Sequence, residues 1–141
     1  MEFKNSIGYL LHELAHLINA DSNQVLQERL GIGFAQFKVL MVLEERDGLT
    51  QKQISTLLRQ TEASISRQVK VLVAKRLVTS RQSSSNRREH LVFLTDRGIQ
   101  MVDKATNALN SYHAPMFEHL SEKEQLKIAR TLQLIRNSIE K

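Results

Sequence analysis

Residues 50–98 read TQKQISTLLRQTEASISRQVKVLVAKRLVTSRQSSSNRREHLVFLTDRG, and this stretch decides the fold. It begins with a T-x-x-Q capping box at Thr50 and Gln53, in which each side chain can bond a free backbone amide of the other residue. A short helix with an apolar face follows. Apolar residues recur at helical spacing after Thr61, which predicts a second helix with its polar side outward. The stretch therefore predicts two short helices joined by a tight turn.

The second half of the same stretch predicts a β-hairpin with a basic tip. Strand character is expected over residues 77–81 and 91–94, where β-branched and aromatic residues gather. The polar residues between them, 83–88, form the tip and include Arg87 and Arg88. Two helices followed by such a hairpin are typical of a winged helix-turn-helix. We therefore expect a mainly α protein with a small β-hairpin wing.

Helices are also expected before this stretch. An apolar stripe predicts a first helix over about residues 4–20, which the apolar residues of 25–30 either extend or follow. A second helix is expected after two glycines, and the Asp-Gly turn at residues 47–48 should end it. The first helix carries more apolar residues than a small chain can cover, which favours a homodimer.

Two further helices are expected beyond the hairpin. Thr95 can cap a long helix that reaches towards Tyr112, and Pro115 is expected to break it from the last helix. Ser121 and Glu124 form another capping box, S-x-x-E, at the start of that last helix. An apolar stripe then continues to the C-terminus and gives the proposed dimer its second surface.

The composition limits the classes of protein and site. The 141 residues fit one domain that needs neither disulfides nor a structural metal. The absence of Cys excludes a thiol redox switch, a disulfide framework and a thiolate zinc site. No apolar run is long enough to span a membrane, so we expect a cytoplasmic protein. A P-loop and a dinucleotide fingerprint are also missing, and we expect no cofactor.

Positive charge is concentrated in the middle of the chain. Residues 50–97 carry ten Lys or Arg against three acidic residues, which is a net charge of +7. The whole chain carries +5, so the residues outside this window sum to −2. A basic window on a helix-turn-helix favours double-stranded DNA as the partner. A winged helix that binds protein is the alternative, and salt-insensitive binding would favour it.

The residues expected to contact DNA come from the two short helices and the wing. In such a helix pair the second helix enters the major groove, where its N-terminal residues face base edges. Arg67 can make a bidentate base contact, whereas Lys70 is expected at a phosphate. Arg87 and Arg88 are expected in the minor groove or at flanking phosphates. The predicted DNA-contacting residues are Thr50, Gln51, Thr61, Ser64, Ser66, Arg67, Lys70, Arg81, Arg87 and Arg88.

The segment HELAH at residues 12–16 matches the H-E-x-x-H pattern of zinc peptidases. On a helix, His12 and His16 would share one face, with Glu13 nearby. No strand precedes the segment to build a substrate cleft, and a catalytic zinc needs a third ligand. We therefore expect no enzyme activity and assign no metal site. The alternative is a metal-responsive regulator that uses His12 and His16, with His113 as a further candidate ligand.

Taken in order, these motifs resemble the MarR family of bacterial regulators over nearly the whole chain. The likeness rests on LTQ at residues 49–51, on the run from SISR at residue 64 to Val78, and on NRR and LTDRG within residues 86–98. Together the three stretches are highly specific, although each alone is weak.

The resemblance implies an architecture and a function. Residues 1–141 would form a single MarR-type domain, in which residues 33–98 bind DNA. Residues 1–32 and 99–141 would supply the first, fifth and sixth helices, which interlock in a homodimer. Such a dimer would bind a palindromic operator. The resemblance further implies a ligand-responsive repressor that a small-molecule effector releases from DNA.

The sequence departs from the family pattern at several positions. Asn86 stands where an Asp usually orients the wing Arg through an ion pair, and Arg76 stands where a Gly commonly ends the recognition helix. The turn at Arg59 lacks the usual small residue. Glu62 places an acid at the start of the recognition helix, which suits the helix dipole but repels phosphate.

Overall fold

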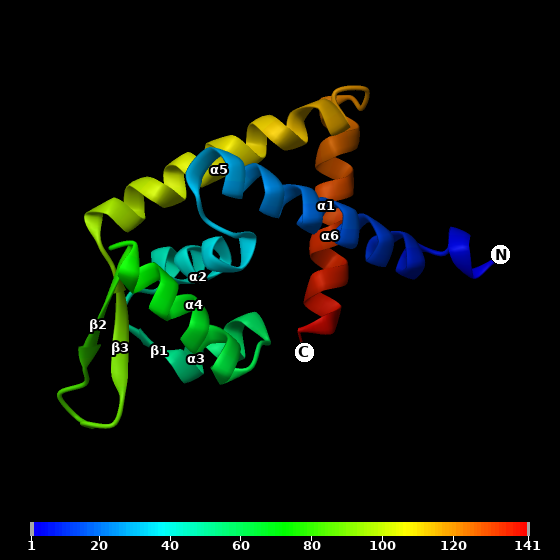
Figure 1. Cartoon of the computed structure of the whole chain (residues 1–141). Coiled ribbons are helices and arrows are strands. Elements are labelled where there is room, and N and C mark those ends of the chain that lie inside the picture. The colour runs from blue at the N-terminus through cyan, green and yellow to red at the C-terminus, as the bar shows by residue number, and fades with distance from the viewer. Residues whose placement is uncertain (1, 141) are drawn as a thin grey trace. The chain divides into compact units, whose positions relative to one another are not determined.

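The computed structural model describes residues 2–140 as a mainly helical chain with a small antiparallel sheet (Figure 1). Its elements in chain order are the 3-10 turn η1 (Phe3–Asn5), α1 (Ile7–Leu30), α2 (Phe34–Glu45), β1 (Leu49–Thr50), α3 (Gln51–Leu58), α4 (Glu62–Ala74), β2 (Val78–Gln82), β3 (His90–Leu94), α5 (Asp96–Phe117) and α6 (Glu122–Ile139). This order confirms the predicted winged helix-turn-helix with helices on both sides. The chain divides into two compact units, one up to Leu109 and one from Asn110 onward, so the division falls within α5.

Helix α1 begins at Ile7, and of the two predicted alternatives it takes the one in which residues 25–30 extend the first helix. It continues without a break to Leu30 and ends at Gly31, whose φ of 69° is left-handed. The polar residues after residue 20 do not stop it. Asn23 turns its side-chain oxygen to the backbone amide of Phe34 at 3.0 Å, and so caps the start of α2 instead of interrupting α1.

The helix-turn-helix is fixed locally by its caps. Thr50 Oγ1 accepts the Gln53 amide at 3.1 Å, and Gln53 Oε1 accepts the Thr50 amide at 2.9 Å, so the predicted capping box is confirmed. Thr61 caps α4 by accepting the Ser64 amide at 3.1 Å, which confirms the predicted start of that helix. Between the helices, Arg59 adopts a left-handed φ of 53°.

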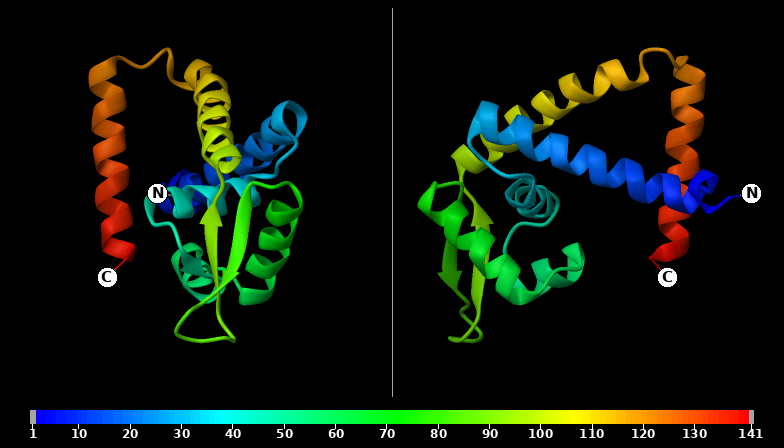
Figure 2. Two further views of the ribbon diagram at one scale, coloured as in Figure 1. Left: turned by 90° about the vertical axis from the view of Figure 1, so that its left-hand side faces the viewer. Right: turned by 45° about the vertical axis from the view of Figure 1, so that its right-hand side comes forward.

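The wing is part of a three-stranded antiparallel sheet in the order β1-β3-β2. β2 pairs with β3 from Val78 opposite Leu94 to Gln82 opposite His90, within one residue of the predicted strands. The loop that joins them projects beyond the helices of the same unit (Figure 2). The sequence pattern missed β1, because two residues are too few to show an alternation.

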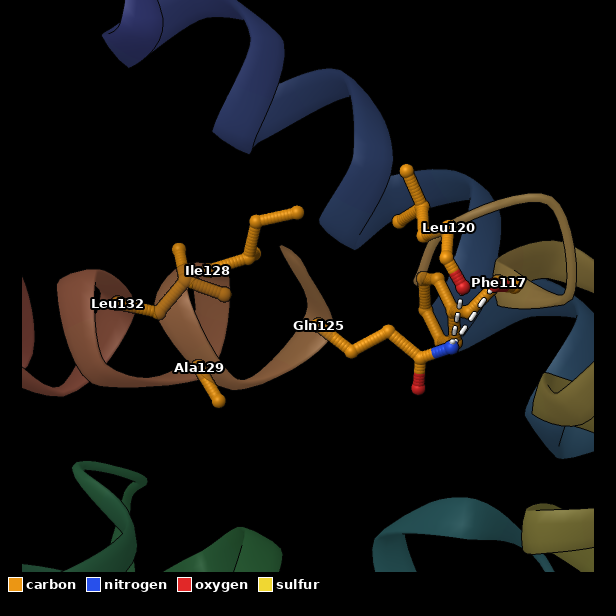
Figure 3. A pocket seen from close by; sticks show the side chains of 6 residues that line it. All are labelled: Phe117, Leu120, Gln125, Ile128, Ala129 and Leu132. Carbon is orange, nitrogen blue, oxygen red and sulfur yellow. Dashed lines mark hydrogen bonds between the residues drawn. The ribbon is translucent and has the colours of Figure 1, made fainter. Parts of the chain in front are cut away.

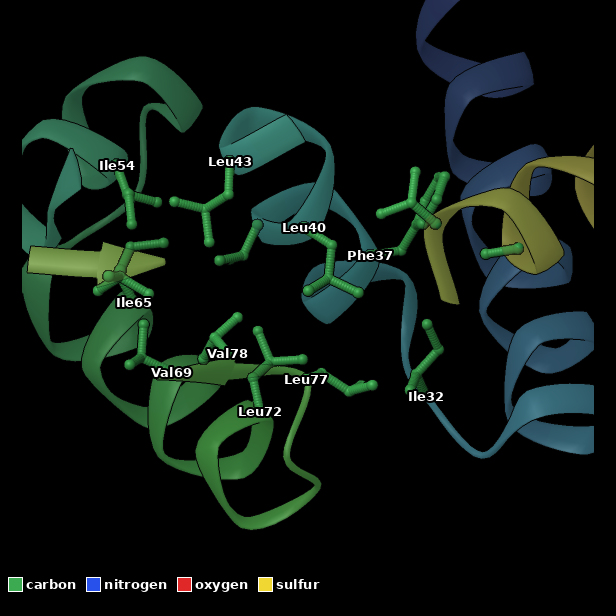
Figure 4. Close-up of a cluster of buried hydrophobic side chains, with 14 of the residues drawn as sticks. Ile32, Phe37, Leu40, Leu43, Ile54, Ile65, Val69, Leu72, Leu77 and Val78 are labelled. Atoms are coloured by element: carbon green, nitrogen blue, oxygen red, sulfur yellow. The ribbon is translucent and has the colours of Figure 1, made fainter. Parts of the chain in front are cut away.

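The core lies between the helix-turn-helix, the sheet, α1 and the part of α5 up to Leu109. α2 is central, since it contacts α1, α3, α4 and β3. Figure 4 shows its Leu43 beside Ile54 of α3, and its Leu40 pointing towards Leu77. The buried side chains of this cluster are Leu26, Ile32, Phe37, Val39, Leu40, Leu43, Leu49, Ile54, Ile65, Val69, Leu72, Leu77, Val78, Val92, Val102, Ala105 and Leu109. One continuous core therefore fixes α3, α4 and the wing strands relative to one another.

Helix α5 does not end where the sequence pattern predicted. Pro115 was expected to break it, but the helix includes Pro115 and ends at Phe117. Pro115 has no amide donor for the carbonyl four residues earlier, and only two helical residues follow it. The capping box of Ser121 and Glu124 that starts α6 is confirmed, with both bonds at 3.1–3.2 Å. No helix within residues 2–140 is long and apolar enough to cross a membrane.

Candidate nucleic-acid interface

Helix α4 has a buried side and a charged side. Ile65, Val69 and Leu72 are buried in the core. The helical repeat places Arg67 and Lys70 on the opposite side, where both are exposed. A guanidinium there can donate to two acceptors of one guanine, whereas the ammonium acts as a point charge. These two side chains lie where the sequence pattern placed them.

The hydroxyl groups near the start of α4 differ in their availability. Thr61 is exposed, but its oxygen already accepts the amide that it caps. Ser64 is half-buried, and its hydroxyl donates to Gln60 Oε1 at 3.2 Å. Ser66 is half-buried on the flank of the helix. Ser64 was expected on the outer side, but it is half-buried and its hydroxyl bonds Gln60 in the turn between α3 and α4.

The start of α3, the first turn of α4 and the tip end of the wing line one groove of about 310 Å³. It is lined by Thr50, Gln51, Lys52, Glu62, Arg88, Glu89 and His90. The groove brings together the predicted residues Thr50, Gln51 and Arg88. It also places the acids Glu62 and Glu89 beside the cations Lys52 and Arg88, so the charge of the groove is mixed.

Two side chains of this groove were missed by the sequence analysis. Lys52 follows the predicted contact Gln51 directly and belongs to the basic window, so its place at the interface could have been predicted from the sequence. His90 gave no such signal. It reaches the groove only because β3 pairs with β1 in the register that puts Leu91 opposite Thr50.

The tip of the wing is held by its own hydrogen bonds. Asn86 Oδ1 accepts the Arg88 amide at 3.0 Å, and the Asn86 carbonyl accepts the Glu89 amide at 3.1 Å. The Gln82 side chain donates to the carbonyl of Arg87 at 2.6 Å. Both Arg side chains are exposed. The side-chain oxygen of Asn86 therefore shapes the turn, and within residues 2–140 it has no recorded bond to a guanidinium.

The C-terminal end of α4 is hydrogen-bonded to the end of α1 and to the start of α5. The Lys75 ammonium donates to the carbonyl of Gly31 at the end of α1. On the other side, Thr95 Oγ1 donates to the Arg76 carbonyl at 2.7 Å, and the Thr95 amide donates to the Leu77 carbonyl at 3.1 Å. The recognition helix is thus positioned by contacts to the end of α1 and the start of α5.

Two residues at this junction have demanding backbone positions. A Cβ added to Gly98 would lie 2.1 Å from the Leu77 carbonyl oxygen, so only glycine lets α5 approach this closely. Arg76 adopts a left-handed φ of 62°, which confirms that a side chain stands where glycine is favoured. At this junction the backbone of α5 therefore packs closely against Leu77, and Arg76, just after α4, adopts an unfavourable backbone conformation.

The predicted alternative metal ligands belong to different compact units. His12 and His16 are exposed on α1, and His113 belongs to the second compact unit. Within residues 2–140, no group of three or more His, Cys, Asp or Glu side chains is arranged to hold a metal ion. The role of these His residues stays a prediction.

Sequence comparison finds a family and a relative that resemble the middle of the chain. A sequence profile described as the MarR family matches residues 30–89. The uncharacterized HTH-type transcriptional regulator YdgJ of Bacillus subtilis (strain 168) is 25% identical over 109 residues. That match covers 77% of this chain and 66% of YdgJ, which is just under two thirds of the relative.

Structural comparison extends the likeness to the whole chain. MepR of S. aureus in complex with DNA is 26% identical, with a TM-score of 0.77, and the match covers 98% of this chain and 99% of MepR. The transcriptional repressor CouR bound to a 23-mer DNA duplex is 24% identical, with a TM-score of 0.83 over 96% of this chain and 95% of CouR. CouR from Rhodococcus jostii RHA1 bound to p-coumaroyl-CoA has a TM-score of 0.77 over 96% of this chain and 94% of CouR.

Proposed function

This chain belongs to the MarR family of winged helix-turn-helix transcriptional regulators, and we propose that it binds a palindromic duplex operator as a homodimer and represses transcription until an effector releases it. The family consists of DNA-binding transcriptional regulators that are not enzymes, so the H-E-x-x-H segment does not mark a peptidase. The proposal rests on one observation: the exposed basic side of α4, the groove beside it and the wing all belong to the same compact unit.

The proposed contacts with DNA follow from which side chains are exposed. α4 enters the major groove, where Arg67 takes a base edge and Lys70 takes a phosphate. Arg87 and Arg88 on the wing reach the minor groove, where negative potential is strongest over narrow A·T tracts. Residues 50–97 carry a net charge of +7, which supports this orientation. The complex of MepR with DNA, at 26% identity over almost the whole chain, supports it as well.

The proposed dimer rests on apolar side chains that the chain leaves exposed. In α1 these are Ile7, Leu10, Leu14 and Leu17. In the second unit, an apolar pocket of about 310 Å³ lies where α5 turns into α6 (Figure 3). Its lining residues are Phe117, Leu120, Gln125, Ile128, Ala129 and Leu132. The side-chain amide of Gln125 donates to the carbonyls of Phe117 and Leu120, so the pocket presents a nearly apolar surface.

We assign residues 1–32 and 99–141 to the dimer interface and residues 33–98 to DNA binding.

The proposed response to a small molecule rests on CouR. CouR is a transcriptional repressor with one structure bound to a DNA duplex and another bound to p-coumaroyl-CoA. In our chain, the junction of Lys75, Arg76 and Thr95 would transmit a movement of α1 or α5 to the recognition helix, because both long helices bond the end of α4 there. An effector that changes the position of either helix would therefore change the spacing of the two recognition helices.

Selection of bound duplexes from a random pool tests the proposed function. A two-fold symmetric consensus with half-sites about one helical turn apart is the expected result. Binding to the selected duplex should fall steeply with salt, because several phosphates are neutralised at once. If no duplex is enriched, or if retention does not depend on salt, the chain is better explained as a winged helix that binds protein.

A further inference from the structure

The ring of Phe93 on β3 is fixed against the turn that precedes the sheet. Gly48 has a left-handed φ of 75°, and a Cβ added there would lie 2.8 Å from Phe93 Cε1. The ring therefore rests on the bare backbone of Gly48. Asp47 Oδ1 accepts the Leu94 amide at 2.8 Å, and the Gly48 amide donates to the Val92 carbonyl at 3.1 Å, so the turn is bonded to β3 on both sides of Phe93.

Arg81 on β2 stacks on this ring. Its guanidinium carbon lies 4.7 Å from the centroid of Phe93, within the range of a cation–π contact. The strand register explains the contact. Thr79 lies opposite Phe93 and Arg81 lies opposite Leu91, so Arg81 and Phe93 are diagonal neighbours on one face of the hairpin. Val78 and Val92 are buried on the other face, so the stack is on the face turned away from the core.

A ring holds a guanidinium without using its donors. An acidic partner would occupy N–H groups and cancel the charge, whereas a phenyl face accepts the flat side of the cation and leaves its five N–H groups free at the edge. Arg81 is exposed, and within residues 2–140 the ring of Phe93 is the one partner recorded for its side chain. The guanidinium is thus confined, charged and open to an anion.

We propose that Phe93 is a positioning residue that holds Arg81 ready for a contact with a DNA phosphate. A free Arg side chain loses rotamer entropy when it binds, and a side chain that is already confined loses less. The contact is with the DNA backbone because Arg81 stands on the strand and not at the tip, where Arg87 and Arg88 reach furthest. The proposal rests on the DNA binding proposed above and adds a residue that no charge or hydrogen-bond pattern would select.

A double-mutant cycle tests the proposal on the selected duplex. The wild type, Arg81→Ala, Phe93→Leu and the double variant are compared by fluorescence anisotropy at several KCl concentrations. Arg81→Ala should weaken binding about five- to tenfold and lower the slope of log affinity against log salt by about 0.9, since one phosphate contact is lost. Phe93→Leu should weaken binding about two- to fivefold without changing the slope, because the contact still forms but costs more. The double variant should bind no more weakly than Arg81→Ala alone.

Two further variants separate positioning from a purely structural role. Phe93→Trp keeps an aromatic face and should restore binding to within about twofold of the wild type. Because the chain has no Trp, this variant also reports its own ring environment, and its emission should change when Arg81→Ala is added without DNA. Phe34→Leu is the matched control, since it removes a comparable contact with Lys38 on α2, 5.7 Å from the ring centroid, and should leave DNA affinity unchanged.

The outcomes distinguish this inference from the proposed function. Equal losses from Phe93→Leu in the wild-type and Arg81→Ala backgrounds would show that Phe93 acts only through the fold, and the inference would be wrong. Failure of Phe93→Trp to restore binding in a variant with wild-type thermal stability would have the same meaning. If the wild type itself enriches no duplex, the proposed function fails first.

Discussion

Helices α4 and α6 are both amphipathic and both begin at a capping hydroxyl residue, yet they differ in what covers their apolar side. Ile65 and Leu72 of α4 are 0% exposed, whereas Ile128 and Leu132 of α6 are 45% and 44% exposed. The same pattern in the sequence thus has a partner inside the chain in one case and an open face in the other. Helix α4 is therefore stabilised by the core of its own unit, whereas α6 needs a further surface to bury a similar area.

The largest expected effect contrasts the two helices directly. Leu72→Ala should lower the free energy of unfolding by about 2–5 kcal/mol, because it leaves a cavity in a closed core. Leu132→Ala should change the stability of the monomer by less than about 1 kcal/mol, because that side chain is half-exposed. Urea unfolding at low protein concentration measures both. Equal losses would mean that the apolar side of α6 is already covered within one chain.

A charge on α6 should affect assembly and not folding. Leu132→Lys is expected to raise the dimer dissociation constant at least about tenfold, since an ammonium would have to be buried between the two copies. Leu134→Lys is the matched control, because Leu134 lies on the other side of the helix and is 70% exposed. Sedimentation velocity over a concentration series gives the constants. A wild type that is monomeric at micromolar concentration would contradict the proposed dimer and its two half-sites.

On the exposed side of α4, Arg67 is expected to read a base and Lys70 to contact a phosphate, and two variants separate these roles. Arg67→Ala should cost about 1–3 kcal/mol on the selected duplex and much less on random DNA, because a bidentate base contact is specific. Lys70→Ala should weaken both by the same factor and lower the salt slope by about 0.9. Titrations with both duplexes decide the matter, and equal losses for Arg67→Ala would rule out base reading by this residue.

The smallest expected effect concerns the end of α4. Arg76→Gly should raise the free energy of unfolding by up to about 1 kcal/mol, because glycine adopts the left-handed φ of 62° without the Cβ penalty. Arg46→Gly is the control. Arg46 has an extended φ of −144°, so glycine there should destabilise the protein by a few tenths of a kcal/mol to about 1 kcal/mol. Thermal unfolding of the three proteins compares them, and a loss of stability for Arg76→Gly would show that the side chain holds the junction.

Local features of the interface could be predicted because their causes lie within a few residues. The caps at Thr50, Thr95 and Ser121 each need one hydroxyl and one amide three residues later, and all three were predicted from the sequence and confirmed. The exposure of Arg67 and Lys70 follows from helical spacing alone. The prediction at Pro115 was wrong because it took the cost of one proline as enough to end the helix, whereas α5 continues two residues beyond it.

The fold class, the order of the helices and the basic window follow from the amino-acid sequence, because caps, periodicity and charge act along the chain. Only the tertiary structure decided the addition of β1 to the sheet, the close approach of Gly98 to Leu77, and the stacking of Arg81 on Phe93. Each of these joins residues that are at least a dozen positions apart. Their geometry depends on strand register and on which backbone can approach which, and no single stretch of sequence contains that information.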